Sequence, residues 1–176
     1  MQPWKKKKPL MRQAKFTTVF DPMEREVLGN LTSTVSEAII QRAQSAPKDE
    51  LAEMMDMPSG HTEAPEDPSL ARLFPDFQRP EDQEYDGDAS LLRSLHENDI
   101  AKAKLKNLQV VNTALGPTGG VEVAIGEDEA QAFVAALNDL RLYVAAGEGP
   151  NETDRDAIVE WLAFNQDSLL TAMMEG

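Results

Sequence analysis

The sequence predicts a mainly α protein, a single-domain helical bundle of four longer helices, one or two short helices and a small two-stranded β ribbon. Three observations lead to this prediction. Apolar residues recur at helical spacing in four long stretches, and alternation typical of strands occurs only in two short ones. No period of 20–50 residues repeats, which argues against a solenoid. The 176 residues, 41% of them apolar and 27% charged, suit one globular domain.

Composition excludes several classes of protein. The chain has no cysteine, so disulfides, thiolate metal ligands and a cysteine nucleophile are excluded. No stretch of about 18 apolar residues predicts a membrane-spanning helix, and the basic start is not followed by the apolar core of a secretion signal. No G-x-S-x-G elbow or glycine-rich phosphate loop occurs. We therefore expect a cytoplasmic protein, away from membranes, with no predicted catalytic residue and no cofactor.

The N-terminal segment is basic although the chain as a whole is acidic. Residues 1–15, which include "WKKKKP", carry six cations and no acid, so with a total of −14 the rest of the chain carries −20. We expect residues 1–13 to be a flexible basic arm ahead of a single domain at residues 14–174. Because a body at −20 repels phosphate backbones, a solubilising tail is favoured over a DNA-binding arm.

The first strand and the first long helix adjoin each other. "AKFTTVF" (14–20) is rich in aromatic and β-branched residues and places Phe16, Thr18 and Phe20 on one side of an extended strand. In "DPMERE", Asp21 suits the N-cap, Pro22 the first helical position and Glu24 the capping box. The helix is expected to run to about Ala46. Its apolar stripe, taken as core, comprises Met23, Val27, Leu31, Val35, Ala38 and Ile39, with Leu28 beside it.

An acidic, proline- and methionine-containing insertion is expected at about residues 47–88. Thirteen acids against three cations give it a net charge of −10. Two short helices are predicted within it, in "DELAEMMDM" (49–57) and "DPSLARLF" (67–74). Flexible methionines adapt to protein partners, so residues 49–77 are the candidate docking surface. The alternative, a lid packed on its own domain, is equally compatible with the sequence.

The second half of the chain predicts the remaining elements. A long helix at residues 90–115 is expected, with a jog near Asn98 and its apolar face at Leu91, Leu95 and further residues. The strand "VEVAI" (121–125) alternates, and its expected partner is the first strand. The helix at residues 127–147 has three acids at its start and the most apolar surface, so it should be central. Thr153 is expected to cap the last helix.

The two histidines of the chain are candidate binding residues. His61 and His96, with Glu63, Glu97 or Asp99 nearby, would suit zinc or iron if the fold brought them together. There is no HExxH motif and no histidine pair at i,i+4. Local hydrogen bonding is therefore the favoured interpretation, and no metal is predicted.

A second candidate group lies around "LNDLRL" on the central helix. Arg141 falls on or beside the apolar stripe, where a charge needs a partner. Asn138 and Asp139 flank it, and the last helix offers Asn165 and Gln166. A structural network joining these two helices is favoured over a binding site.

Several segments together resemble one family in their order and spacing. The chain is similar to the actinobacterial proteins grouped as DUF2017, a domain of unknown function. The resemblance covers most of residues 4–170 and rests on "DELAEMMDMPSGH", "EDPSLARLFPDFQRPED", "LLRSLHENDIAKAK", "LNDLRL" and "WLAFNQDSLL". It implies little about activity, since members are uncharacterised. Some are labelled transcriptional regulators, and they are encoded near the adaptor that delivers N-degron substrates to the Clp protease.

The sequence thus predicts a non-enzymatic protein–protein interaction or adaptor module. Its partner would be a protein of unknown identity, and the chain itself a monomer or homodimer. Two alternatives stay open. One is a transcriptional regulator that binds DNA through the basic arm, although nucleic acid is not the expected partner. The other is a metal-dependent enzyme that uses the two histidines.

Overall fold

The computed structural model confirms the mainly helical prediction. It describes residues 1–57, 59–77, 85–117, 120–148 and 151–176, with residues 85–88 described for their backbone alone. The helices are α1 (Pro22–Gln44), α2 (Glu50–Met54), α3 (Pro68–Leu73), α4 (Tyr85–Leu115), α5 (Glu127–Ala146) and α6 (Glu152–Met174). The strands are β1 (Lys5–Lys7), β2 (Lys15–Val19) and β3 (Glu122–Ile125).

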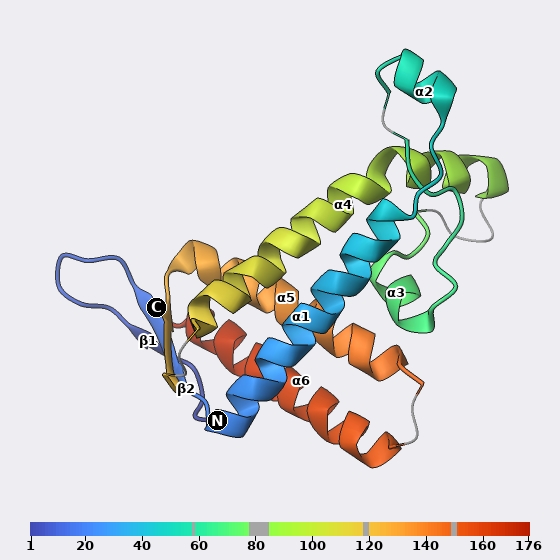
Figure 1. The fold of residues 1–176 in the computed structure, drawn as a ribbon. Coiled ribbons are helices and arrows are strands. Elements are labelled where there is room, and N and C mark those ends of the chain that lie inside the picture. Colours follow the sequence, from blue (N-terminus) through green and yellow to red (C-terminus); the bar gives the residue numbers. More distant parts are fainter. Residues whose placement is uncertain (58, 78–84, 118–119, 149–150) are drawn as a thin grey trace.

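The core is organised around α5, as its apolar surface predicts. This helix packs against α6 and α4, and also against α3, α1 and β2. Its residues Phe133, Leu137 and Leu140 are fully buried. In Figure 1, α1 and α4 run alongside each other over one side of the bundle, with the sheet at one end and α2 at the other.

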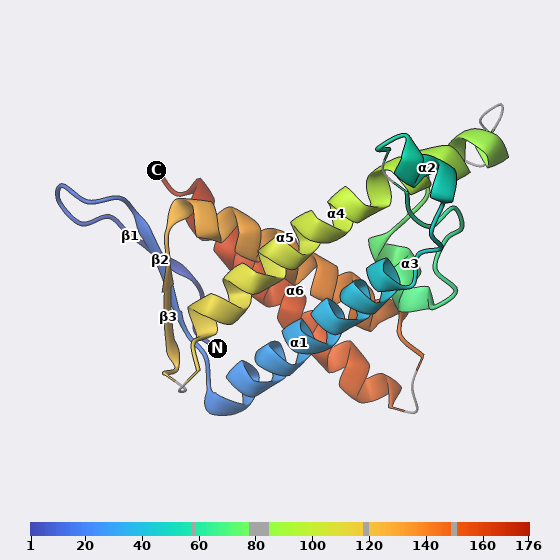
Figure 2. The same cartoon turned by 45° about the horizontal axis from the view of Figure 1, so that its top comes forward.

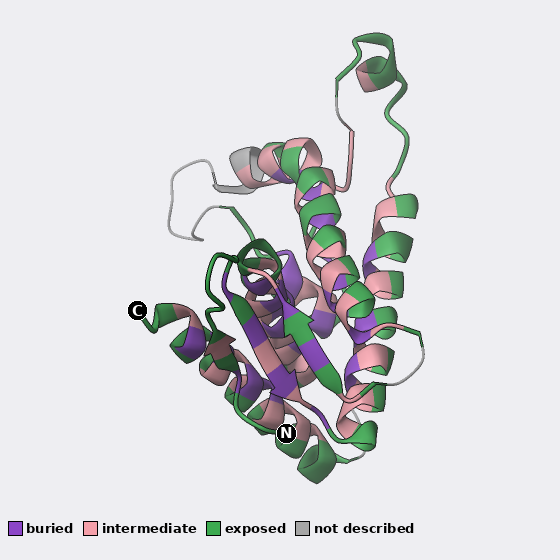
Figure 3. Ribbon diagram, turned by 90° about the vertical axis from the view of Figure 1, so that its left-hand side faces the viewer, coloured by how far each residue is buried: buried purple, intermediate pink, exposed green. Residues whose placement is uncertain are grey.

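The sheet has three antiparallel strands in the order β1-β2-β3, so the prediction of a two-stranded ribbon is wrong in its strand count. The predicted pair is present, with Phe16 opposite Ile125. The additional strand, β1, pairs with β2 through Lys6 opposite Phe16. Buried and exposed residues alternate along the strands (Figure 3), because one face of the sheet packs on α5 and α6.

Residues 1–13, expected as a flexible arm, contain this strand and a core aromatic residue. Trp4 is only 4% exposed, and its indole Nε1 donates to Asn165 Oδ1 at 2.7 Å. Its ring makes edge-on contacts with Phe133 at 5.3 Å and Phe20 at 6.3 Å between ring centroids. Lys6 Nζ donates to the carbonyl of Glu175. The aromatic contacts and strand pairing therefore attach the start of the chain to the bundle.

Helix starts were predicted well where the capping residues are close in sequence. Glu24 N donates to Asp21 Oδ1 at 2.8 Å and Asp21 N to Glu24 Oε1 at 2.9 Å, which is the predicted capping box. The last helix differs: Asn151 is its N-cap, and Thr153 lies inside the first turn.

Two expectations about the long helices are wrong. Met23 and Leu91, both assigned to the core, are exposed. The buried residues of α1 include Val35 and Ile39 from the expected stripe, Leu28, which was expected beside it, and Thr32. The helix expected at residues 90–115 begins earlier, as the continuous helix α4, and its axis changes direction toward its N-terminal end (Figure 1).

Candidate interaction surface

The acidic insertion divides into a part that projects and a part that packs. None of the five residues of α2 is buried, and Figure 1 shows this short helix at the tip of a loop that stands away from the bundle. By contrast, Pro65, Ser69, Leu73 and Phe74 are buried against the body. The lid alternative therefore describes the second part of the insertion and not the first.

Four exposed apolar side chains of the projection form what we call the α2 face: Leu51, Met54, Met55 and Met57. Met54 is the most exposed of the four, at 84%. The neighbouring side chains include four acids, which are Asp49, Glu50, Glu53 and Asp56. An apolar patch with a charged rim is typical of a protein-binding surface.

Local hydrogen bonds hold the projection in a defined conformation although it does not join the core. Asp49 Oδ1 caps α2 by accepting from the backbone N–H groups of Leu51 and Ala52, at 3.0 and 3.3 Å. After the helix, Met57 N donates back to the Ala52 carbonyl at 2.9 Å. Asp56 takes a left-handed conformation with φ of 54° that allows this turn. The tip is thus ordered by its own backbone.

The segment that returns from the tip of the projection, residues 59–63, is attached to α1 and α4 by polar contacts. Arg42 Nη2 donates to the carbonyl of Glu63 at 2.6 Å, and His61 Nε2 lies 2.7 Å from the carbonyl of Arg42. Asn98 Nδ2 donates to the Ser59 carbonyl at 3.0 Å. A Cβ at Gly60 would lie 3.2 Å from a backbone oxygen of α4, so this position favours glycine. These contacts fix the base of the projection while its tip stays exposed.

Beneath this attachment lies a buried ionic network. Arg93 and Glu97 are each only 2% exposed. Glu97 accepts from Arg93 Nη1 at 2.9 Å and from Arg42 through two hydrogen bonds, Nε at 3.2 Å and Nη2 at 3.1 Å. Arg93 also donates to Asp76 Oδ1 at 2.7 Å and to the Phe74 carbonyl at 3.0 Å. The network joins α1, α4 and the segment after α3.

The network was missed by sequence reasoning because its members are charged. A signal was nevertheless present in the periodicity of α4. Counting back seven residues from the buried Leu108 reaches the buried Ala101, and two further steps of four residues reach Glu97 and Arg93. The opposite charges at i,i+4 on a core-facing stripe predict a buried pair, whereas apolar residues alone led to Leu91.

The two histidines lie in different surroundings. His61 contacts the Arg42 carbonyl and, at 3.2 Å, Ser45 Oγ, which is local hydrogen bonding of the kind expected. His96 is exposed, with its ring centroid 6.1 Å from that of Phe77. Within the described residues, no group of three or more His, Asp or Glu side chains could hold a metal ion. The metal-enzyme hypothesis gains no support from these contacts.

The candidate residues on α5 separate into two groups. Asp139 Oδ1 accepts from Lys104 Nζ of α4 at 2.9 Å. Arg141 Nη2 donates within its own helix to Asn138 Oδ1 at 2.9 Å, and its Nε is buried without a hydrogen-bond partner. Gln166 is half-buried on α6. The Lys104–Asp139 ion pair therefore joins α4 to α5. The network predicted around Arg141 was expected to join α5 to α6, but the hydrogen bond that Arg141 makes to Asn138 stays within α5.

A polar hollow of about 650 Å³ lies between the base of the projection and α5. His61, Asp67 and Tyr143 are among its lining residues. Burial, and then the Asp67 carboxylate, raise the pKa of the Tyr143 phenol above its ordinary value of 10.0. The phenol therefore stays protonated, and stability contributed by this shift is lost as the pH rises past 10.0.

The fold and surface define a mainly helical protein with an acidic, methionine-bearing projection held by a buried ionic network. Residues 1–173 match the family described as "Domain of unknown function (DUF2017)". The chain belongs to this family, as the ordered motifs predicted. No helix within the described ranges is long and apolar enough to cross a membrane.

Similar proteins are known in mycobacteria. The "Oxidative stress regulator AosR" of Mycobacterium tuberculosis and that of Mycobacterium bovis are each 34% identical in an alignment 182 residues long, which covers 91% of this chain and 83% of the relative. The "Putative oxidative stress regulator AosR" of Mycobacterium leprae is 32% identical in an alignment 184 residues long, with the same coverage. No solved structure matches the chain.

Proposed function

We propose that this protein is a non-enzymatic regulator that acts by binding a partner protein through the α2 face. One observation carries the proposal: four large apolar side chains stand exposed on a projection whose base is firmly attached. Covering exposed apolar groups with a partner is favourable, by about 25 cal/mol per Å² of buried apolar area. The relatives named as regulators support a regulatory role for such a contact.

The chemistry of the projection defines the kind of partner. Methionine side chains have several rotatable bonds and a polarizable sulfur, so they adapt to an apolar groove. The acids around them favour a partner whose groove is lined by cations. The partner is therefore expected to present an apolar, basic cleft into which the tip of the projection inserts.

We expect the double substitution Met54→Glu and Met55→Glu to weaken partner binding by about tenfold or more, because two apolar contacts are lost at the centre of the interface. Stability should change by less than about 0.5 kcal/mol, because both side chains are exposed. The measurement has two steps. Tagged protein first captures partners from the host lysate for identification by mass spectrometry, and the dissociation constant of the purified partner is then determined.

A matched control is Met23→Glu, which changes an equally exposed methionine on α1. It should leave the same partner bound with the affinity of the unmodified protein. If the α2 variant retained that affinity while folding normally, the α2 face would not be the docking surface.

Oxidation should act on the same face. Peroxide transfers one oxygen atom to a methionine thioether, giving a sulfoxide and water, and this converts an apolar side chain into a polar one. We expect mild peroxide treatment to weaken partner binding because Met54, Met55 and Met57 are exposed to solvent. A variant with leucine at these three positions should bind before and after treatment. Equal sensitivity of that variant would assign the effect to other residues.

A further inference from the structure

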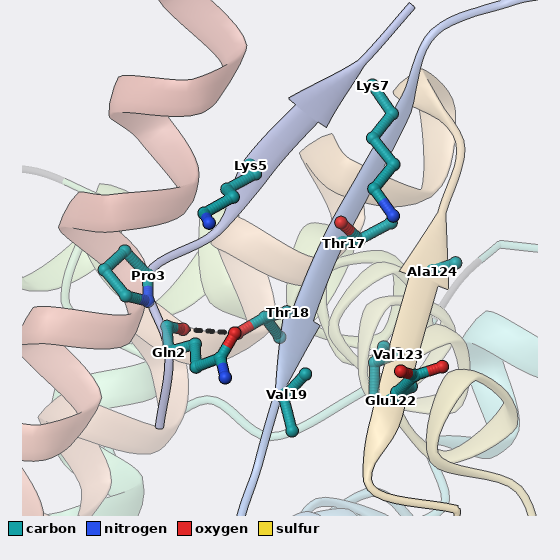
Figure 4. Close-up of a pocket in the computed structure, with 10 residues that line it drawn as sticks. All are labelled: Gln2, Pro3, Lys5, Lys7, Thr17, Thr18, Val19, Glu122, Val123 and Ala124. Atoms are coloured by element: carbon teal, nitrogen blue, oxygen red, sulfur yellow. Dashed lines mark hydrogen bonds between the residues drawn. The ribbon is translucent and has the colours of Figure 1, made fainter. Parts of the chain in front are cut away.

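The sheet has a second, chemically different surface at the opposite end of the molecule from α2 (Figures 1 and 2). Alternation along the strands directs Trp4, Phe16, Val123 and other buried residues toward the helices. The residues between them form what we call the outer sheet face: Lys5, Lys7, Lys15, Thr17, Val19, Glu122 and Ala124. Most of these residues line a hollow of about 480 Å³ (Figure 4).

The lysines of this face are placed where they repel each other. Lys7 lies directly opposite Lys15 in the register of β1 and β2, and both are exposed. Like charges in directly opposed positions destabilise a sheet. Neither ammonium group, nor that of Lys5, has an ion pair with any residue that the structure describes. A bound anion would relieve the repulsion.

Edge protection explains only part of the pattern. Lysines on an exposed edge strand prevent pairing with other chains, and this accounts for Lys5 and Lys7 on β1. Lys15 lies on the central strand β2, where it pairs with Lys7 and not along the outer edge of β1, so protection of that edge does not account for it. Its position beside Lys7 therefore indicates a surface for an anionic ligand.

We propose that the outer sheet face binds an acidic segment of a partner protein. Carboxylates of the segment would pair with Lys5, Lys7 and Lys15, while an apolar side chain would lie over Val19 and Ala124. The small side chains of this part of the face leave room for such a chain. This surface does not depend on the α2 face, so the two proposals can fail separately.

A protein segment fits the face better than nucleic acid does. Glu122 lies opposite Val19 on the same face, so an evenly charged phosphate backbone would meet its carboxylate, whereas a peptide can place an apolar side chain there. No aromatic side chain stands on the outer sheet face to stack on a base, as single-strand binding commonly requires. A long polyanion would also meet the −20 charge of the remaining chain, whereas a short acidic segment contacts only the lysines.

The test uses a short fluorescein-labelled peptide of alternating glutamate and valine, with fluorescence anisotropy as the measurement. We expect the peptide to bind the full-length protein, and we expect this binding to weaken as salt is added. The variant Lys7→Gln with Lys15→Gln should bind about tenfold more weakly. The matched control, Lys102→Gln with Lys106→Gln on the exposed side of α4, removes the same charge and should bind normally.

Denaturant unfolding and the binding of a second probe, a short DNA duplex, complete the test. The Lys7/Lys15 variant should unfold at the same or a higher denaturant concentration than the unmodified protein, since repulsion is removed. A short DNA duplex that binds through these lysines more tightly than the peptide would overturn the proposal in favour of a nucleic-acid surface. Binding of neither probe would also overturn it and would leave the lysines a structural role alone. Substitution is used in place of deletion because Trp4 is a core residue.

Discussion

Replacing Glu97 by alanine is expected to lower the free energy of unfolding by about 3–5 kcal/mol, because it removes the buried carboxylate that pairs with both Arg93 and Arg42. Arg93 is 2% exposed, and among the residues that the structure describes it would keep Asp76 and the Phe74 carbonyl as partners. Arg42 would lose a two-point contact that is stronger than a single hydrogen bond. Urea denaturation followed by circular dichroism measures the loss.

The control for this prediction is Glu160→Ala, which removes an exposed carboxylate from α6. Its effect should stay within about 0.5 kcal/mol, as for other exposed positions. Equal losses for the two variants would show that the network contributes no more than surface charges do. Glu97 positions Arg42, and Arg42 holds the returning segment of the projection at Glu63. The Glu97 variant should therefore bind the partner of the α2 face less tightly.

Replacing Trp4 by alanine is the second large effect, with an expected cost of about 3–5 kcal/mol for removing a buried aromatic ring. The substitution removes the edge-on contacts with Phe133 and Phe20 and leaves Asn165 Oδ1 without its donor. Urea denaturation should show an earlier midpoint. The signal should be circular dichroism, because the variant also lacks one of the two tryptophans that report by fluorescence.

Leu10→Ala is the matched control in the same N-terminal segment, since this side chain is 96% exposed. We expect it to be neutral. If Trp4→Ala were equally neutral, residues 1–13 would behave as the flexible arm that the sequence indicated, and β1 would contribute nothing to stability. A Trp4→Phe variant separates ring packing from the hydrogen bond, whose loss at a buried acceptor costs about 1–3 kcal/mol.

The two proposed surfaces lie at opposite ends of the molecule and differ in their chemistry. The α2 face is apolar and surrounded by acids, and the outer sheet face is basic. Between them, the bundle centred on α5 keeps the ends apart (Figure 1). A protein of this form would contact two partner surfaces at once, which is consistent with an adaptor-type role under the proposed function.

Local features of the fold were determined by the sequence itself. The capping box of Asp21 and Glu24 depends on residues three apart, so it forms wherever the chain turns into a helix. The alternation in β3 and the apolar surface of α5 likewise show within each segment which residues avoid water. These signals predicted the helical class, the pairing of β2 with β3 and the central place of α5.

The tertiary structure alone decided the features that depend on distant partners. Trp4 is a core residue because Phe133 packs against its ring and Asn165, which is 161 positions away, accepts a hydrogen bond from its indole N–H. Arg93 and Glu97 are buried because Arg42 and Asp76 reach them from other elements. A charge or a strand edge can leave water only when its counterpart is in place. Periodicity within one segment carries no information about that counterpart, so these residues looked like surface in the sequence.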